Sequence, residues 1–221
     1  MISGMTYTGN VQVGGPPDVH ELPKLVIEKL AVGAMNNNAY LLRSRFTGDQ
    51  ILVDAAADRN ALLELIGDDG ISGVVTTHQH GDHWGALAPI VAATGARTYA
   101  HPDDAAGIPV DTDVLLRGGD TLVFGDIELR VIHLVGHTPG SIALVYDDPE
   151  GAPHLFTGDS LFPGGVGRTT RPEDFASLYA DVVSKIFDVL PDETWVYPGH
   201  GFDTTLGAER PHLEEWRQRG W

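Results

Sequence analysis

Short apolar stretches, bounded by glycine, proline or aspartate, recur along the whole chain. In its first half these stretches are rich in β-branched residues and alternate with stretches of helical spacing. The pattern predicts strands over residues 24–32, 39–43, 51–55, 73–77 and 97–100. It also predicts a helix over 59–66, where Leu62, Leu63 and Ile66 share one face, and a second helix over 84–94.

The second half has shorter strands, joined by turns that contain glycine and aspartate. These strands are expected over residues 120–124, 127–134, 141–146, 154–157 and 195–197. A helix is predicted over 172–190, because Pro172 suits a first turn and the acidic Glu173 and Asp174 suit its positive end. A last helix is predicted over 207–218.

Strands that alternate with helices in two similar halves favour two sheets packed face to face, with helices on the outside. A chain of 221 residues fits one domain with a sizeable core. We therefore expect a single domain over residues 1–221. Residues 1–22, which include Gly14-Gly15-Pro16-Pro17, are expected to form an irregular leader.

Composition and charge narrow the classes of function. The chain has no cysteine, which excludes disulfides, thiolate metal ligands and a cysteine nucleophile. Its 31 acidic and 14 basic residues give a formal charge of -17, so we do not expect nucleic acid as a partner. No apolar stretch approaches the ~20 residues of a membrane helix, and the N-terminus lacks the pattern of a signal peptide. We expect no membrane partner and a cytoplasmic location.

The densest group of polar side chains follows the predicted strand over 73–77. Residues 78–83 read His-x-His-x-Asp-His, which places three imidazoles and a carboxylate within six positions. A single loop histidine is usually only a surface residue, but four such groups this close would repel one another without a shared partner. Neutral imidazole and carboxylate oxygen both suit Zn²⁺, and also Fe or Mn.

Three later segments add candidate ligands. They are Gly136-His137-Thr138-Pro139-Gly140-Ser141, Thr157-Gly158-Asp159-Ser160 and Pro198-Gly199-His200-Gly201. Each follows a strand-like stretch and is flanked by glycine or proline, so each is expected on a loop at a strand end. Functional residues concentrate on such loops.

Taken in order, these four segments resemble the motifs of the metallo-β-lactamase-fold hydrolases, and within them the glyoxalase II (hydroxyacylglutathione hydrolase) group. The similarity is to short forms that lack a C-terminal helical domain, and it runs from about Asn37 to Arg210. The resemblance implies an α+β fold, a four-layer αββα sandwich.

The resemblance also implies two divalent metal ions. One ion takes His78, His80 and His137, the second takes Asp82, His83 and His200, and Asp159 bridges both. The sequence is compatible with this partition, because alternate residues of an extended segment face one side and Gly81 permits a turn. Zinc is the first expectation, with iron or manganese as alternatives.

Such a pair of ions turns a shared water molecule into hydroxide, which is the expected nucleophile on a carbonyl. Asp82 is expected to orient the hydroxide or carry its proton. Asp54 resembles a position that supports a metal ligand from behind, although an aspartate there also suits a turn or a helix cap. Asn37 resembles a structural asparagine. We expect activity to fall below about pH 6 as imidazoles take up protons.

The glycine-rich loop over 162–170 lines the substrate pocket by resemblance. Arg168 stands where hydrolases of glutathione thioesters carry a basic residue, and a solvated surface arginine is an equal alternative. Phe202 replaces a tyrosine of many relatives, so a hydroxyl that would bind the peptide of glutathione is missing. These departures bear on glutathione rather than on hydrolysis.

The other five histidines are expected to lie outside the ligand set. His20 and His212 lie near polar ends, His101 caps a loop, His133 has a core or supporting role, and His154 is peripheral.

The leading interpretation is a binuclear hydrolase that acts on a small-molecule thioester, such as an S-2-hydroxyacyl thiol. A persulfide dioxygenase with one iron is the main alternative, because those relatives share the His/Asp segments and a loop like residues 165–169. A lactonase of the same fold and a metal-binding protein without activity are further alternatives. The sequence leaves open the acyl group, the thiol, the metal and the oligomeric state.

Overall fold

Two mixed β-sheets form the centre of the protein. The computed structural model describes residues 7–220, so the N-terminal part of the expected leader, residues 1–6, lies outside the described residues. The first sheet has seven strands in sequence order: β1 (Asp18–Glu21), β2 (Leu25–Val32), β3 (Asn37–Ser44), β4 (Gln50–Val53), β5 (Gly73–Val75), β6 (Arg97–Ala100) and β7 (Val114–Leu115). Neighbouring strands are antiparallel from β1 to β4 and parallel from β4 to β7.

The second sheet has the strand order β15-β14-β11-β10-β9-β8. Its strands are β8 (Thr121–Phe124), β9 (Ile127–Leu134), β10 (Ser141–Tyr146), β11 (His154–Gly158), β14 (Trp195–Pro198) and β15 (Thr204–Thr205). Only the β11–β14 pair is parallel. A small hairpin of β12 (Leu161–Phe162) and β13 (Gly165–Val166) stands in the expected glycine-rich loop.

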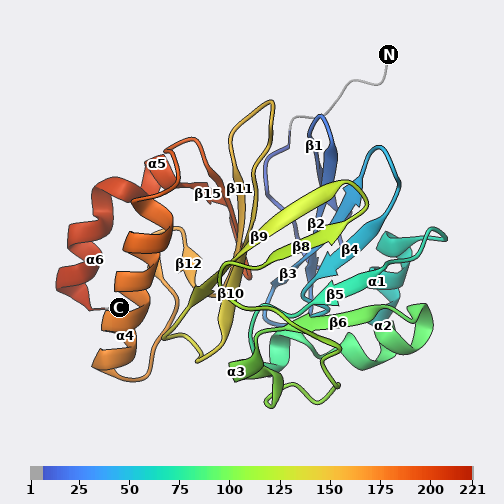
Figure 1. Cartoon of the computed structure of the whole chain (residues 1–221), viewed down its shortest axis with the longest axis horizontal. Helices are drawn as coiled ribbons and strands as arrows, with labels where there is room; N and C mark the ends of the chain where they lie inside the picture. The colour runs from blue at the N-terminus through green and yellow to red at the C-terminus, as the bar shows by residue number, and fades with distance from the viewer. Residues whose placement is uncertain (1–6, 221) are drawn as a thin grey trace.

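Helices cover both outer faces of the paired sheets (Figure 1). On one side lie α1 (Arg59–Ile66), α2 (Leu87–Thr94) and, at the sheet edge, α3 (Pro102–Ala105). On the other side lie α4 (Pro172–Val182), α5 (Leu206–Glu209) and α6 (Leu213–Arg219). The structure therefore confirms the four-layer αββα sandwich. Among the described residues, no helix has both the length and the apolar character needed to cross a bilayer.

Three apolar layers hold the four layers of secondary structure together. The middle layer lies between the sheets and contains Leu25, Ile27 and Phe156. A second layer joins the first sheet to α1 and α2, and a third joins the second sheet to α4 and α6. Strand alternation explains the division, since Leu144 of β10 faces the middle layer while its neighbour Val145 faces the helices.

Beyond small shifts of bounds, the structure differs from the sequence prediction in three predicted segments, and it adds the short elements α3, β7, β12, β13 and β15. Residues 18–21 of the expected leader form β1, because all four pair with residues 26–29 of β2. The helix expected over 207–218 is divided into α5, a 3₁₀ turn (Arg210–His212) and α6, with Pro211 inside the turn. The helix over 172–190 ends its α-helical part at Val182 and continues as a π-helical turn (Val183–Phe187).

Candidate metal centre

The candidate ligands lie on loops that meet at one edge of the sandwich. His78, His80, Asp82 and His83 follow β5, His137 precedes β10, Asp159 follows β11 and His200 follows β14. Two backbone hydrogen bonds join the two sheets at this edge, from Ile142 N to Thr77 O (2.9 Å) and from Asn38 N to Gly199 O (2.8 Å). The loops are therefore held by both sheets.

One group of ring nitrogens comes from His78, His80 and His137. Nε2 of His78 lies 3.1 Å from Nδ1 of His80, which lies 3.0 Å from Nε2 of His137. Nδ1 of His137 donates to the carbonyl oxygen of Arg168 at 2.7 Å. That bond fixes the ring with its Nε2 toward the other two histidines.

A second group contains Asp82, His83 and His200. Nε2 of His83 lies 3.2 Å from Nε2 of His200 and 3.6 Å from Oδ2 of Asp82. Nε2 of His200 lies 3.2 Å from the same Asp82 oxygen, while its Nδ1 donates to the carbonyl oxygen of Met35. The two groups match the division of ligands that the resemblance implies.

Asp159 lies between the two groups. Its Oδ2 is 3.7 Å from Nε2 of His137 and 3.4 Å from Nε2 of His200, while Oδ1 is 3.3 Å from Nε2 of His83. Oδ1 is buried and accepts no hydrogen bond from the described residues. A buried carboxylate oxygen without a donor fits a metal ligand.

The spacing of these atoms suits metal binding. Nitrogen ligands of a tetrahedral ion stand about 2.0–2.1 Å from the metal and hence about 3.4 Å from one another. Neighbouring candidate ligand atoms approach one another to 3.0–3.7 Å, and all those of one group lie within 4.8 Å of one another. The seven side chains therefore fit a pair of divalent ions without a large rearrangement.

The electrostatics of the cluster are uneven. Burial lowers the pKa of His78 far below its usual range, with the His83 charge acting in the same direction. For His83 burial acts downward as well, but Asp54 and Asp159 outweigh it and raise the pKa to about 10. Burial would raise the pKa of Asp159, yet the imidazoles of His200 and His83 hold it well below its usual range. The acidic side chains thus favour positive charge at their centre, which a metal ion would supply.

Asp54 and Asn37 both contact candidate ligands. Oδ2 of Asp54 accepts a hydrogen bond from Nδ1 of His83 at 2.7 Å, and its oxygens also accept from the backbone N and the hydroxyl of Thr77. Asp54 itself has a φ of 59° at the end of β4. Nδ2 of Asn37 donates to Oδ2 of Asp82 at 2.9 Å. Asn37 therefore orients Asp82 in addition to its place in β3.

Gly81 does not act as the sequence suggests. Its φ lies outside the left-handed region, and a Cβ there would meet only the Trp84 ring, at 3.5 Å. The turn between His80 and Asp82 is a short 3₁₀ helix (Gly81–His83), which any residue can enter. The site needs a glycine at Gly199 instead, where a Cβ would stand 2.2 Å from Oδ1 of Asp159 and 2.7 Å from Cε1 of His83.

The two proposed substrate residues adjoin different ligand groups, Arg168 that of His137 and Phe202 that of His200. Arg168 is exposed, and its backbone oxygen holds His137. Phe202, two residues after His200, is 67% exposed. A cavity of about 360 Å³ adjoins it and is lined by Asn10, Val11, Gln12, Val13, Asn36 and Gly201. A larger cavity of about 1120 Å³ lies beside α1, and no candidate ligand lines it.

The remaining histidines lie away from the ligands. His154 is 5% exposed, which corrects the expectation of a peripheral residue, and its Nδ1 lies 2.9 Å from the hydroxyl of Tyr197. Nδ1 of His20 lies 2.8 Å from the same hydroxyl.

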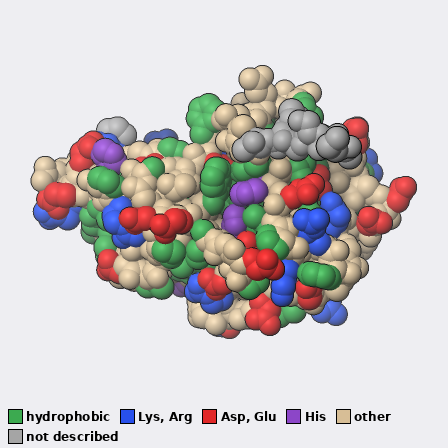
Figure 2. Space-filling model, turned by 90° about the horizontal axis from the view of Figure 1, so that it is seen from above, with side chains coloured by type: hydrophobic (Ala, Val, Ile, Leu, Met, Phe, Trp, Pro, Cys, Tyr) green, Lys and Arg blue, Asp and Glu red, His purple; other side chains and the backbone are tan. Residues whose placement is uncertain are grey.

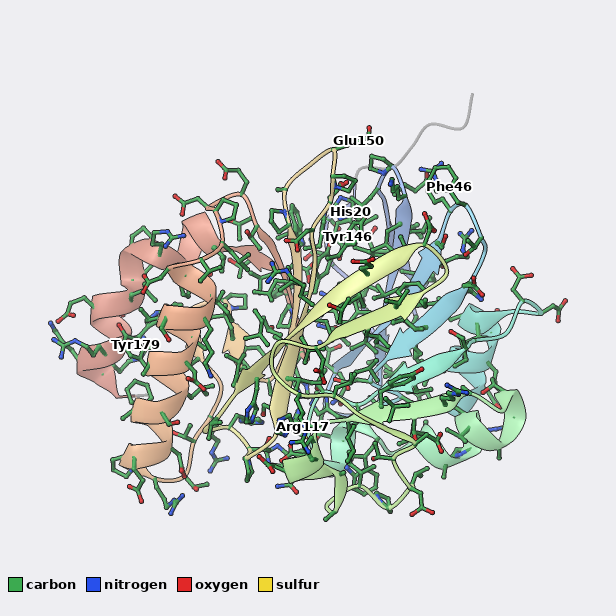
Figure 3. All side chains as sticks on the ribbon, viewed as in Figure 1. His20, Phe46, Arg117, Tyr146, Glu150 and Tyr179 are labelled. Atoms are coloured by element: carbon green, nitrogen blue, oxygen red, sulfur yellow. The ribbon has the colours of Figure 1, made fainter. Side chains whose placement is uncertain are left out.

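His20 and Tyr146 lie together at the upper edge of the sandwich in Figure 3. On the face seen from that edge, acidic side chains lie among the basic ones (Figure 2). His212 is exposed, as expected.

His101 and His133 form a pair that sequence reasoning missed. His101 caps α3, with Nδ1 accepting from Asp103 N, and its ring stacks on His133 at a centroid distance of 3.8 Å. Nitrogen lone pairs lie in the ring planes, so stacked rings direct them side by side rather than at one point. The adjoining hollow is lined by Arg117, labelled in Figure 3, and by Lys185. We therefore assign this pair to packing.

Comparison with known proteins places the chain in a family. The model of the metallo-beta-lactamase superfamily matches residues 32–200. The chain belongs to this superfamily, and its fold and His/Asp clusters are those of a metal-dependent hydrolase. A hydroxyacylglutathione hydrolase of Polaromonas sp. (strain JS666) is 35% identical over 182 residues, which are 80% of this chain and 67% of that protein. The match therefore spans about two thirds of the length of that enzyme.

Several solved structures share the fold of this chain. The B3 metallo-beta-lactamase BLEG-1 is 30% identical, with a TM-score of 0.73 over 86% of this chain and 99% of that one. TTHA1623 in a di-iron-bound form is 34% identical, with a TM-score of 0.68 over 82% and 96%. ETHE1 from Myxococcus xanthus is 28% identical, with a TM-score of 0.74 over 87% and 84%.

Proposed function

We propose that this protein is a binuclear metal-dependent hydrolase that cleaves a small-molecule thioester. The observation that carries the proposal is the convergence of seven His and Asp side chains into two groups joined by Asp159. A relative named hydroxyacylglutathione hydrolase and a di-iron-bound neighbour support the substrate class and the metal count. Zinc and iron both suit this set of nitrogen and oxygen ligands.

The ligand roles follow from the geometry. His78, His80 and His137 would hold one ion, Asp82, His83 and His200 the other, and Asp159 both. Divalent ions in such a site lower the pKa of a water molecule and polarise a carbonyl oxygen. Asp82 is the more exposed of the two candidate carboxylate ligands, with 25% of its side chain accessible against 13% for Asp159. It is therefore placed to accept a proton from water at the open side of the site.

The supporting residues orient the imidazole ligands. Asp54 accepts from Nδ1 of His83, which leaves Nε2 free to face the metal position. The carbonyl oxygens of Arg168 and Met35 do the same for His137 and His200. The chain thus fixes the ring orientation of three ligands, with Nε2 of each toward the metal position.

The substrate would bind between Arg168 and Phe202. An exposed arginine on the His137 side can meet a carboxylate of the substrate. On the His200 side, Phe202 and the neutral side chains of Asn10, Val11 and Gln12 offer no cation. We therefore propose a thioester that carries a negative charge on the part that faces Arg168 and an uncharged part that faces Phe202.

Steady-state kinetics test this function. The metal-replete protein should hydrolyse S-lactoylglutathione or the same acyl group on other thiols, and His80→Ala should reduce kcat/KM by at least about 100-fold. Nitrocefin, a β-lactam, serves as the comparison substrate because one structural neighbour is a metallo-beta-lactamase. Absence of thioester hydrolysis with both metal positions filled would reject the proposal.

A persulfide dioxygenase with a single iron is the second candidate. The loop over residues 165–169 resembles that of persulfide dioxygenases, and ETHE1 from Myxococcus xanthus shares the fold with a TM-score of 0.74. Elemental analysis separates the two: the hydrolase requires two ions per chain and consumes no oxygen. One iron per chain, together with oxygen uptake on glutathione persulfide, would establish the alternative.

A further inference from the structure

A buried aspartate that sequence reasoning missed connects two of the ligand loops. Asp104 belongs to α3 and is 0% exposed. Its Oδ2 accepts from the backbone N of Gln79 at 2.9 Å and from the hydroxyl of Thr138 at 2.6 Å, and its Oδ1 accepts from the backbone N of Gly140 at 2.7 Å. Gln79 stands between His78 and His80, and Thr138 follows His137.

The fit around this carboxylate is close. A Cβ on Gly140 would lie 2.6 Å from the backbone N of Asp104 and 2.8 Å from its Cγ, so only glycine allows the approach. The Thr138 hydroxyl also lies 2.6 Å from the hydroxyl of Ser141. The hydrogen bonds to Asp104 therefore hold the backbone N of Gln79, the Thr138 hydroxyl and the backbone N of Gly140 in place.

The stacked histidine pair holds α3 against the same loop. His101 caps the helix that carries Asp104, and its ring lies on His133. Nε2 of His133 donates to the carbonyl oxygen of Pro139 at 2.8 Å, one residue before Gly140. The loop with His137 is thus attached to α3 by Asp104 and to β9 by His133.

The second ligand group has a different support. Asp54 bonds Thr77 and His83, Asn37 bonds Asp82, and His200 bonds the carbonyl of Met35. None of these bonds involves α3. Asp54 also reaches the first group, because the Thr77 hydroxyl that bonds it lies 3.0 Å from Nδ1 of His78. Asp104 differs from Asp54 in that it bonds the His137 loop as well as the segment between His78 and His80.

The geometry points to Asp104 as the positioning residue of the His78/His80/His137 group. It sets the distance between the His78–His80 segment and the His137 loop, so its loss should empty this metal position and spare the Asp82/His83/His200 position. The inference rests on the proposed binuclear function and adds a residue that touches neither metal nor substrate.

Asp104→Asn is the direct test, because an amide can present an acceptor to one side of the former carboxylate only. The NH₂ group of the new asparagine must face either the backbone N of Gly140 or the donors of Gln79 and Thr138. In both cases donor faces donor, and a buried donor is left without a partner. The matched control is Asp113→Asn. Both Thr98 donors bond a single oxygen of Asp113, so the amide oxygen can take its place, and Asp113 bonds no ligand loop.

Both variants and the wild-type protein are stripped with chelator and titrated with Co²⁺. Ions per chain and the visible absorption of bound Co²⁺ are measured, with circular dichroism as the check of folding. We expect two ions in the wild-type protein and in Asp113→Asn. Asp104→Asn should hold one ion tightly and bind the other at least about 10-fold more weakly, with loss of its absorption bands.

Two tight ions in a folded Asp104→Asn protein would overturn the inference and leave the proposed function standing. A single ion in the wild-type protein would overturn the binuclear function, and unchanged affinity for that ion in Asp104→Asn would overturn the inference too. If Asp104→Asn does not fold, Thr138→Val removes one donor to the same carboxylate. Thr138→Val should weaken the binding of one ion and leave that of the other as in the wild-type protein. Equal affinity for both ions would reject the role of Asp104.

Discussion

The ammonium group of Lys29 lies 2.6 Å from Oδ1 of Asp203, and both side chains are almost fully buried between the two sheets. Nζ also donates to the carbonyl oxygens of Gly9 and Gly201, at 2.7 and 2.8 Å. Gly201 directly follows the candidate ligand His200. One buried cation therefore attaches both the N-terminal segment and the His200 loop to β2.

Lys29→Met should destabilise the fold strongly, because it leaves the Asp203 charge buried without its partner. We expect a loss of about 3–5 kcal/mol in the free energy of unfolding of the metal-free protein. Lys29→Met combined with Asp203→Asn should be the more stable of the two, since no isolated charge remains and Tyr7 and Trp195 keep their acceptor. Urea denaturation measures both. A double variant as unstable as the single one would contradict this account.

His154 should make the fold less stable in mild acid. Burial lowers its pKa to about 4, with a further contribution from His20, against an ordinary value of 6.5. In this range the unfolded chain binds the proton and the folded one does not. The stability is therefore fully present above about pH 6.5 and is lost progressively as the pH falls to about 4, by about 3 kcal/mol in all.

His154→Asn checks this dependence. The amide keeps an atom near the position of Nδ1, which contacts the Tyr197 hydroxyl, and cannot be protonated. The free energy of unfolding should vary less between pH 7 and pH 4 in the variant than in the wild-type protein. His212→Asn is the control at an exposed histidine. Equal pH slopes in the wild-type protein and in His154→Asn would disprove the assignment.

Two glycines beside the ligands should respond differently to alanine. Gly199→Ala places Cβ 2.2 Å from Oδ1 of Asp159, so it should displace this carboxylate and lower metal affinity at both positions by about 10–100-fold. Gly81→Ala meets only the Trp84 ring at ordinary contact distance and should leave metal affinity unchanged. Titration with Zn²⁺ in the presence of a competing chelator measures both. Equal effects would mean that the steric account of Gly199 is wrong.

Metal loading should release protons at pH 7. Asp54 and Asp159 outweigh burial and raise the pKa of His83 to about 10 in the absence of cations, so an arriving ion must displace this proton. Apparent affinity should then rise with pH, and occupancy should fall below about pH 6. Calorimetry in buffers of different ionisation enthalpy counts the protons. Asp54→Asn, which removes the largest upward contribution, should release fewer, and an unchanged count would contradict this cause.

Local pattern was sufficient for the regular elements. The strand β9 and the helix α1 have the predicted bounds, because apolar alternation and helical spacing are visible within a few residues. The division of the ligands into His78/His80/His137 and Asp82/His83/His200 also agrees between resemblance and geometry. Motif order carries this information, since each motif directly follows or precedes a strand that the pattern reveals.

Contacts between distant segments were beyond the reach of local pattern. Residues 18–21 become β1 only through pairing with β2, and His154 is buried only because Tyr197 of a neighbouring strand lies beside it. Asp104 looks like an acidic residue in a polar turn, since its partners Gln79 and Thr138 are 25 and 34 positions away. Burial of a polar side chain depends on the whole fold and leaves no periodic signal in the sequence.

The seven candidate ligands come from both sheets, and the Ile142–Thr77 and Asn38–Gly199 bonds close the edge between them. A half-assembled chain would therefore present only part of the set. Tight uptake of both ions becomes a late event in maturation, possible after the two halves have docked. Bound metal ions should in return stabilise the contact between the two sheets. Their removal should weaken this contact before either half of the chain unfolds.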